Sequence, residues 1–296
     1  MTTPELIRLR RDDLALRLCP ELGGAIHDLT WRDQPVLRPP MPDALARRSV
    51  RGLGCFPLLP YSNRIANGRF SWRGEHFQLD HNFPDHPHSM HGVGWQQPWR
   101  VISSDDVEAR IAIDYDPDET GLYTWPFAFS ATLTVALDGD GALLTLDLRN
   151  TDARAWPAGL GFHPHFPTTP DLTLGFAADA VWTADPLSLP LASVPIPPAW
   201  RFDPPIHPPA PLDNCFAGWN GAARLRWPDR DLSVGIEADA RFRHLMVYAP
   251  ERAGYCAVEP ATHLPDAINR DGEHGLVVIA PGESLTGWMR LRAGPA

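Results

Sequence analysis

The segment 127–148, FAFSATLTVALDGDGALLTLDL, decides the fold class of this chain. Apolar residues recur there at every second position on both sides of a turn sequence, Asp138-Gly139-Asp140-Gly141. Because successive side chains of a β-strand point to opposite faces, this alternation is typical of two half-buried strands. The Asp-Gly pairs suit the tight turn of a hairpin. The segment therefore predicts an antiparallel β-hairpin near the middle of the chain.

The same alternation recurs in other parts of the sequence. It predicts hairpins around Arg73-Gly74 and around Pro228–Asp231, and further strands at Ile111–Tyr115 and Leu285–Leu291. The 33 prolines leave little room for long helices, since proline breaks a helix interior. We expect only one short helical stretch, around Asp43–Arg48. Many short strands separated by Gly and Pro predict an all-β fold, a large and mostly antiparallel β-sandwich.

A proline-rich segment, residues 186–211, holds ten prolines among 26 residues. This density predicts an extended surface loop, because a paired strand tolerates few prolines. The strand pattern has the same character before and after the segment, so it does not indicate a domain boundary. We expect residues 1–296 to form a single domain.

The charge balance excludes several classes of partner. With 26 Lys and Arg against 36 Asp and Glu, the formal net charge is −10, which repels phosphate backbones and anionic lipid surfaces. We therefore expect no nucleic-acid or membrane partner. The N-terminal MTTPELIRLR lacks an apolar run of signal-peptide or membrane-span length, so we expect a cytoplasmic protein.

The four cysteines do not form a recognisable metal or redox motif. They stand far apart, without C-x-x-C spacing, which favours free and buried thiols; they are Cys19, Cys55, Cys215 and Cys256.

Polar residues that interrupt the strand pattern are the candidates for a functional site. Arg64, between Asn63 and Ile65, could donate several fixed hydrogen bonds to ligand hydroxyls, or it could pair with a carboxylate at a strand end. Asp213 closes the proline-rich segment and could accept hydrogen bonds from a ligand, or it could serve as a turn residue.

Four histidines lie within eleven positions, at His81, His86, His88 and His91. Three imidazoles could hold a metal ion, but no acidic or cysteine ligand recurs at a diagnostic spacing. We therefore predict no metal site. His91, which lies beside Gly92 and close to Trp95, is the best candidate of the four for a ligand contact.

His163, His165 and Glu259 interrupt apolar stretches and are candidates for proton transfer. His163 and His165 would face the same side of a strand, and imidazole titrates near neutral pH. Alternatively, one of the two is a satisfied core histidine and the other is exposed. Glu259 ends an apolar run, and a carboxylate is rarely buried without a partner or a function, so it is the strongest candidate for a general base. Its alternative is a strand-end glutamate facing water.

Taken in order, these segments resemble the aldose 1-epimerase (galactose mutarotase) family. The resemblance spans most of the chain and rests on six pieces: Asn63-Arg64-Ile65 through Phe70, His91-Gly92, Gly161–Phe166, Asp213–Phe216, Val258-Glu259-Pro260 through Asp266, and Ala280–Glu283.

The resemblance implies a β-sandwich with an open sugar cleft and anomer exchange without a cofactor or metal. Glu259 takes the position of the general base and His163 that of the general acid, while Arg64, His91 and Asp213, with Asn63, line the sugar site. The partner implied is a small aldose, and the chain would act as a monomer or homodimer. Neutral sugars also stack on aromatic rings, which makes Trp95 and Trp219, near the motifs, candidate cleft walls.

The sequence departs from the family pattern at two positions. His165 stands where the family usually has tyrosine, and Met246 stands in place of a glutamine, so the preferred sugar could differ from galactose.

Two other functions compete with mutarotation of a free sugar. A hexose 6-phosphate mutarotase would need a cluster of Arg or Lys, and none stands beside the motifs apart from Arg64 and Arg69. A non-catalytic sugar-binding protein need not keep the acid and the base, and both are present here. The sequence therefore favours a mutarotase of a free aldose.

Overall fold

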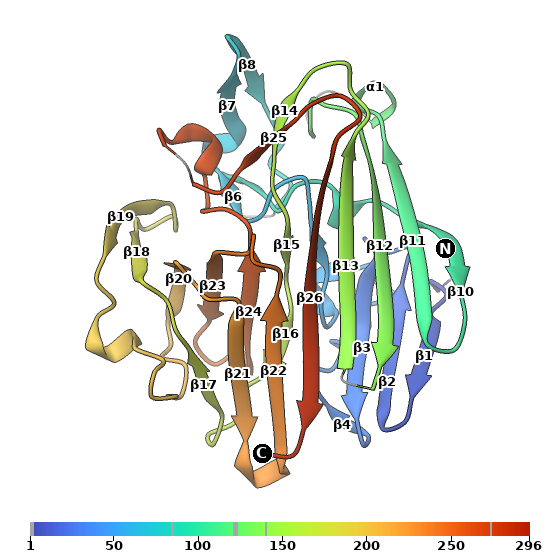
Figure 1. Ribbon diagram of the computed structural model, residues 1–296, viewed down its shortest axis with the longest axis vertical. Coiled ribbons are helices and arrows are strands. Elements are labelled where there is room, and N and C mark those ends of the chain that lie inside the picture. Colours follow the sequence, from blue (N-terminus) through green and yellow to red (C-terminus); the bar gives the residue numbers. More distant parts are fainter. Residues whose placement is uncertain (1–2, 84–85, 121–123, 140, 273) are drawn as a thin grey trace.

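Two large antiparallel sheets form most of the molecule (Figure 1). The computed structural model describes residues 3–83, 86–120, 124–139, 141–272 and 274–296. The first sheet has eight strands in the order β10 (Arg100–Ser104), β11 (Glu108–Tyr115), β12 (Phe129–Asp138), β13 (Gly141–Asn150), β26 (Ser284–Gly294), β22 (Leu232–Ala238), β21 (Ala222–Trp227) and β17 (Thr173–Phe176). This architecture confirms the predicted all-β fold.

The second sheet also has eight strands and carries the candidate site described below. Its order is β19 (Pro190–Val194), β18 (Ala180–Ala184), β20 (Leu212–Ala217), β23 (His244–Ala249), β24 (Tyr255–Ala261), β15 (Gly161–Phe162) and β5 (Pro57–Leu58), and β16 (His165–Pro167) also pairs with β24.

Smaller sheets and short helices complete the fold. A four-stranded sheet, β1 (Ile7–Arg11), β2 (Leu14–Cys19), β3 (Ala25–Trp31) and β4 (Gln34–Pro35), lies behind β11 and β12 in Figure 1. The two-stranded pairs are β6 (Arg64–Ile65) with β9 (Ser89–Met90), β7 (Arg69–Trp72) with β8 (Glu75–Gln78), and β14 (Trp156–Ala158) with β25 (Val277–Ile279). The helical elements are α1 (Pro117–Thr120) and the 3₁₀ turns η1 (Val50–Gly52), η2 (Ala66–Gly68), η3 (Gly94–Gln96), η4 (Pro198–Trp200), η5 (Pro228–Arg230) and η6 (Ala267–Asn269).

The predicted central hairpin is confirmed. β12 and β13 pair from Phe129 with Asn150 to Asp138 with Gly141, and buried residues alternate with half-buried ones along β12. Asp140, in the predicted turn, lies outside the described residues. The two other predicted hairpins are β7 with β8 and β21 with β22, and β11 and β26 are the predicted single strands.

A large hydrophobic core lies against one face of the second sheet. On β23 and β24, Val247 and Val258 belong to this core, whereas Tyr248 and Glu259, next to them in sequence, point to the opposite face. Because side chains alternate along a strand, the residues that build the core also decide which residues face outward into the pocket.

The prediction of a helix around Asp43–Arg48 is wrong. The segment forms turns, and both Asp43 and Arg48 have positive φ, 61° and 50°, which interrupts a right-handed helix at each end.

The expectation that segment 186–211 contains no paired strand is also wrong. β19 (Pro190–Val194) lies within it and pairs with β18. Pro190 is the first residue of β19, and β19 lies at the edge of its sheet, where proline's missing N–H costs no ladder hydrogen bond. The prediction considered the cost of proline inside a sheet, but it did not consider that an edge strand can accommodate proline.

All four cysteines are buried and free, as predicted. Among the described residues, no helix is both long enough and apolar enough to cross a membrane.

Candidate active site

A pocket of about 750 Å³ lies on the outer face of the second sheet. This volume is typical of small-molecule sites. All six residues predicted for the sugar site line it: Asn63, Arg64, His91, His163, Asp213 and Glu259. The structure therefore brings together side chains that are up to 196 positions apart, from Asn63 to Glu259.

Neighbouring strands of the second sheet present Asp213, Tyr248 and Glu259 to the pocket. Asp213 on β20 is directly opposite Tyr248 on β23, and Met246 on β23 is directly opposite Glu259 on β24. These positions fall on one face because each strand keeps the period of two that the core requires.

Glu259 is buried, with 3% of its surface exposed, so the alternative of a water-facing glutamate is wrong. Its Oε1 lies 3.3 Å from His163 Nε2, and its Oε2 is buried without a hydrogen-bond partner among the described residues. Burial raises the pKa of this carboxyl well above its usual range; Asp213 adds to the increase and Arg64 opposes it. A carboxyl with a raised pKa is a stronger base than an ordinary carboxylate, which suits proton transfer.

His163 lies between β15 and β16 rather than within a strand. Its backbone N–H donates to the Phe56 carbonyl at 2.9 Å, and its ring stacks on the Phe56 ring at 4.6 Å between centroids. Burial lowers the pKa of His163 to about 3, so the free protein holds a neutral imidazole at neutral pH.

His165 lies beside His163, with 4.6 Å between the ring centroids, and also lines the pocket. Both rings reach the same pocket. The expectation that they share one face of a strand does not hold, because His163 lies between two strands. His165 is 4% exposed, so neither histidine is the exposed member of the alternative pair.

Arg64 pairs with Asp213, and this pair lies inside the pocket. Arg64 Nη2 donates to Asp213 Oδ2 at 2.9 Å, and Arg64 Nη1 donates to Asn63 Oδ1 at 3.0 Å. The carboxylate pairing considered for Arg64 is therefore present, and the pair lines the pocket. Asp213 lies in β20 and is not a turn residue.

Asn63 and His91 hold each other in an uncommon backbone conformation. Both have positive φ, 60° and 63°, a region that few non-glycine residues occupy. The Asn63 N–H donates to His91 Nδ1 at 3.1 Å, and the His91 N–H donates to the Asn63 carbonyl at 2.8 Å. Burial also lowers the pKa of His91 well below its usual value. A neutral His91 whose Nδ1 accepts a hydrogen bond carries its proton on Nε2, which can donate to a ligand.

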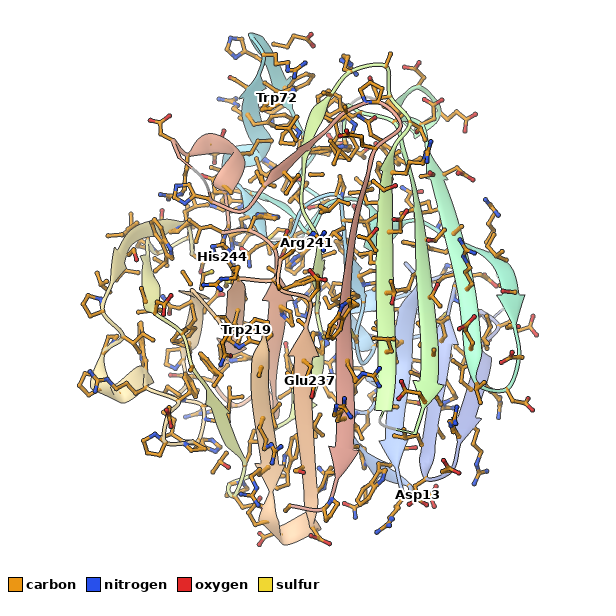
Figure 2. All side chains as sticks on the ribbon, viewed as in Figure 1. Asp13, Trp72, Trp219, Glu237, Arg241 and His244 are labelled. Carbon is orange, nitrogen blue, oxygen red and sulfur yellow. The ribbon has the colours of Figure 1, made fainter. Side chains whose placement is uncertain are left out.

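The tryptophans suggested as cleft walls do not line the pocket. Trp219, labelled in Figure 2, is fully buried in the core, and Trp95 lies behind Phe56 with 5.9 Å between ring centroids. The aromatic walls are Phe56, Phe83, Tyr248 and Tyr255.

Two further arginines, Arg38 and Arg51, line the pocket and were not predicted. Arg38 follows two buried apolar residues at the end of the small N-terminal sheet, and no spacing in the sequence links it to the motifs. Tyr255 could have been found, because it stands four residues before Glu259 on the same strand and therefore on the same face.

Among the described residues, no group of three His, Cys, Asp or Glu side chains is arranged to hold a metal ion.

Comparisons with known proteins agree with this fold. The aldose 1-epimerase family model matches residues 5–292. The Escherichia coli (strain K12) protein YphB, which is uncharacterised, is 31% identical over 289 residues, covering 91% of this chain and 92% of YphB. The β-sandwich with a polar pocket is thus that of a mutarotase-like protein. The chain belongs to the aldose 1-epimerase family.

Solved structures show the same fold along the whole chain. A protein from Escherichia coli K12, provisionally assigned as an aldose 1-epimerase, has a TM-score of 0.89 at 27% identity, with 99% of both chains covered. A galactose mutarotase-like protein from Clostridium acetobutylicum has a TM-score of 0.88 at 18% identity, with 99% of this chain and 96% of the other covered.

Proposed function

We propose that this protein is an aldose 1-epimerase, a cofactor-independent isomerase that interconverts the α and β anomers of an aldose. The observation that carries the proposal is the contact between Glu259 Oε1 and His163 Nε2, 3.3 Å apart within a polar pocket. The two oxygens of a cyclic hemiacetal are bonded to one carbon, so an acid and a base this close together can reach both of them.

In the proposed reaction, the Glu259 carboxylate takes the proton from the anomeric hydroxyl. The bond between C1 and the ring oxygen breaks, and His163 Nε2 delivers a proton to the ring oxygen. The open aldehyde rotates about the C1–C2 bond. Reclosure on the other face, with the two residues exchanging roles, gives the opposite anomer. Each proton transfer can accelerate the reaction roughly 10²–10⁴-fold.

For this reaction the pair must carry one titratable proton, either on the Glu259 carboxyl or as the second ring proton of His163. Burial favours a neutral pair in the free protein, with the proton on Glu259, so the proton passes to His163 when the sugar binds. We expect activity to fall at low pH, where a second proton binds, and at high pH, where the pair loses its only proton.

Arg64, His91 and Asp213 are proposed to bind the sugar hydroxyls. The Arg64 guanidinium and the Nε2–H of His91 are donors, while the Asp213 carboxylate is an acceptor. Asn63 positions Arg64, because its side-chain carbonyl accepts hydrogen bonds from both the backbone and the guanidinium of Arg64.

The test is removal of the acid or the base. We expect Glu259→Gln and His163→Asn each to lower the rate of anomer exchange by at least about 10²-fold, because each removes one proton transfer. The rate is measured by polarimetry on freshly dissolved α-D-glucose, α-D-galactose and phosphorylated aldoses, with circular dichroism to check the fold.

Glu237→Gln is the matched control. Glu237 lies on β22 of the first sheet (Figure 2), pairs with Arg292 and does not belong to the pocket lining, so this variant should keep full activity. Full activity in Glu259→Gln would show that the assigned mechanism is wrong. A wild-type protein that binds sugars without accelerating exchange would instead be a sugar-binding protein.

A further inference from the structure

The pocket carries more positive charge than the proposed reaction requires. Three arginines line it, Arg38, Arg51 and Arg64, against two carboxyl groups, Asp213 and Glu259. Arg64 pairs with Asp213. Within the described part of the chain, neither Arg38 nor Arg51 forms an ion pair with a carboxylate. This local excess is notable in a chain whose formal net charge is −10.

Arg38 is a buried cation that pairs with no carboxylate among the described residues. It is 8% exposed, and its Nη2 donates to the carbonyls of Arg51 at 2.7 Å and Leu53 at 2.9 Å. Its guanidinium lies 4.4 Å from the ring centroid of Tyr255, and its Nε has no hydrogen-bond partner in the described residues. Carbonyls and a ring face offset only part of the cost of burying this charge. An anion bound in the pocket would supply the missing counter-charge of Arg38.

Arg51 places a second guanidinium at the same end of the pocket. Its side chain is held 4.0 Å above the ring centroid of Phe83, and its own carbonyl binds Arg38. Arg51 is exposed, so a ligand can reach its donors directly. Two guanidinium groups converging on one region are typical of a site for carboxylate or phosphate.

This cationic region lies on the His163 side of the catalytic pair. The Arg38 N–H donates to the His165 carbonyl at 2.8 Å, and the Tyr255 ring contacts the His165 ring at 5.3 Å between centroids. The charges of Arg38 and Arg51 both act on His163, whereas those of Arg64 and Asp213 act on Glu259.

The side on which the charges lie indicates which part of the sugar they contact. If His163 protonates the ring oxygen, the next ring atom is C5, and C6 is its substituent. A hexopyranose bound in this way directs C6 toward Arg38 and Arg51. We propose that the preferred substrate is an aldose with an anionic group on C6, a uronate or a 6-phosphate, which Arg38 and Arg51 bind. The proposal rests on the anomer exchange proposed above and names its substrate class.

This placement also revises the preference for a free aldose. That preference depended on the lack of further arginines beside the motifs, and the fold supplies two from residues 38 and 51.

The test compares three sugars that differ at C6: D-glucose, D-glucuronate and D-glucose 6-phosphate. Anomer exchange is measured by NMR exchange spectroscopy, with the uncatalysed rate of each sugar subtracted. We expect kcat/KM to be at least about tenfold higher for one of the two anions than for glucose, because hydrogen bonds to a charged group are strong. The anion with the higher kcat/KM shows whether the preferred group on C6 is a carboxylate or a phosphate.

Arg51→Gln should lower the ratio of kcat/KM for the preferred anion to that for glucose by roughly tenfold. Arg47→Gln is the matched control, since Arg47 is exposed and outside the pocket lining, and it should leave this ratio as in the wild type. Equal kcat/KM for all three sugars, or a ratio that Arg51→Gln does not change, would overturn the proposal while leaving anomer exchange intact.

A binding measurement separates this proposal from the catalytic one. Glucose, glucuronate and glucose 6-phosphate are titrated by calorimetry into Glu259→Gln and into the double variant Glu259→Gln/Arg51→Gln. We expect tighter binding of an anion to the first protein, and loss of that advantage in the second. No exchange of any sugar by the wild type would refute the proposed function, and equal binding of all three sugars would refute the anion site.

Discussion

At the scale of single residues, Met246 is an apolar cross-strand neighbour of Glu259. It lies directly across the strand pair from Glu259, is 2% exposed and packs in a small cluster with Cys215 and Leu264. It occupies the position where the sequence comparison suggests a lost glutamine. Burial raises the pKa of Glu259, and the apolar Met246 side chain offers no hydrogen-bond donor to Oε2, which has no partner among the described residues.

We predict that Met246→Gln lowers the pKa of Glu259, because an amide N–H near Oε2 would stabilise the carboxylate. In the free protein this carboxyl carries the single proton of the pair, so a lower pKa lets the pair lose that proton at lower pH, and the alkaline limb of the rate profile should move to lower pH by about one pH unit. The profile of kcat/KM against pH checks this. Met246→Leu, which keeps the site apolar, should leave the alkaline limb in place, and an unmoved alkaline limb in Met246→Gln would contradict this account.

At the residue scale, the sequence also identified the six site residues, because each one interrupts an apolar pattern or belongs to a family motif. It did not identify Arg38 and Arg51. A lone arginine in an irregular segment has no periodic signal, and its value as an anion ligand depends on which distant segment lies beside it.

At the scale of elements, the turn at His91-Gly92 holds one wall of the pocket. Gly92 has a φ of 67°, and a Cβ added there would lie 2.0 Å from the Leu59 carbonyl oxygen. This close approach allows the backbone to pass Leu59 and to place His91 against Asn63. Only glycine fits both the conformation and the space.

We predict that Gly92→Ala destabilises the protein by a few kcal/mol and lowers activity, because the clash displaces the His91 turn. Urea unfolding and polarimetry measure the two effects. Gly74→Ala is the control: Gly74 also has positive φ, 86°, but an added Cβ meets nothing within 4 Å. It should cost only about 1 kcal/mol. Similar losses in the two variants would show that conformation, and not contact with Leu59, is what matters.

Elements with strict period two were predicted well, and irregular elements were not. The hairpin of β12 and β13 has an alternation that only a half-buried strand requires. β19 was missed because its prolines are tolerated only at a sheet edge, and edge position is a property of the assembled sheet. The Asp43–Arg48 stretch has a helical composition, but the positive φ of its end residues prevents a helix.

For the whole molecule, buried histidines should make stability depend on pH. Seven histidines have pKa values lowered by burial: His86, His88, His91, His163, His165, His244 and His263. His263 is an instructive case, because its Nε2 accepts from the Ser62 N–H at 2.9 Å and a proton there would break this bond. His244, labelled in Figure 2, has its pKa lowered to about 4, as does His263.

We predict that the free energy of unfolding falls as the pH drops from about 6.5 to about 4. In this window the unfolded chain binds protons on these histidines and the folded chain does not, so acid favours unfolding. One such residue contributes on the order of a few kcal/mol. Glu259 and Asp266, whose pKa values burial raises, act in the opposite direction, but they are fewer. Urea unfolding at several pH values measures the slope.

His76→Gln, at an exposed position, is the control and should leave that slope unchanged. Constant stability between pH 6.5 and 4 would contradict the prediction.

We also infer that the chain unfolds as one domain, because a single hydrophobic cluster contains residues from Leu9 to Leu291. Two separate transitions in the same urea experiment would disprove this inference.

The sequence by itself determined the strand pattern, the all-β class and the identity of the residues that carry acid, base and hydrogen-bonding groups. These properties depend on local periodicity and on side-chain chemistry. The tertiary structure alone decided that Glu259 and His163 lie 3.3 Å apart, that both are buried, and that Arg38 and Arg51 share their pocket. Distances, burial and the resulting pKa values depend on which distant strands pack together, and no local pattern contains that information.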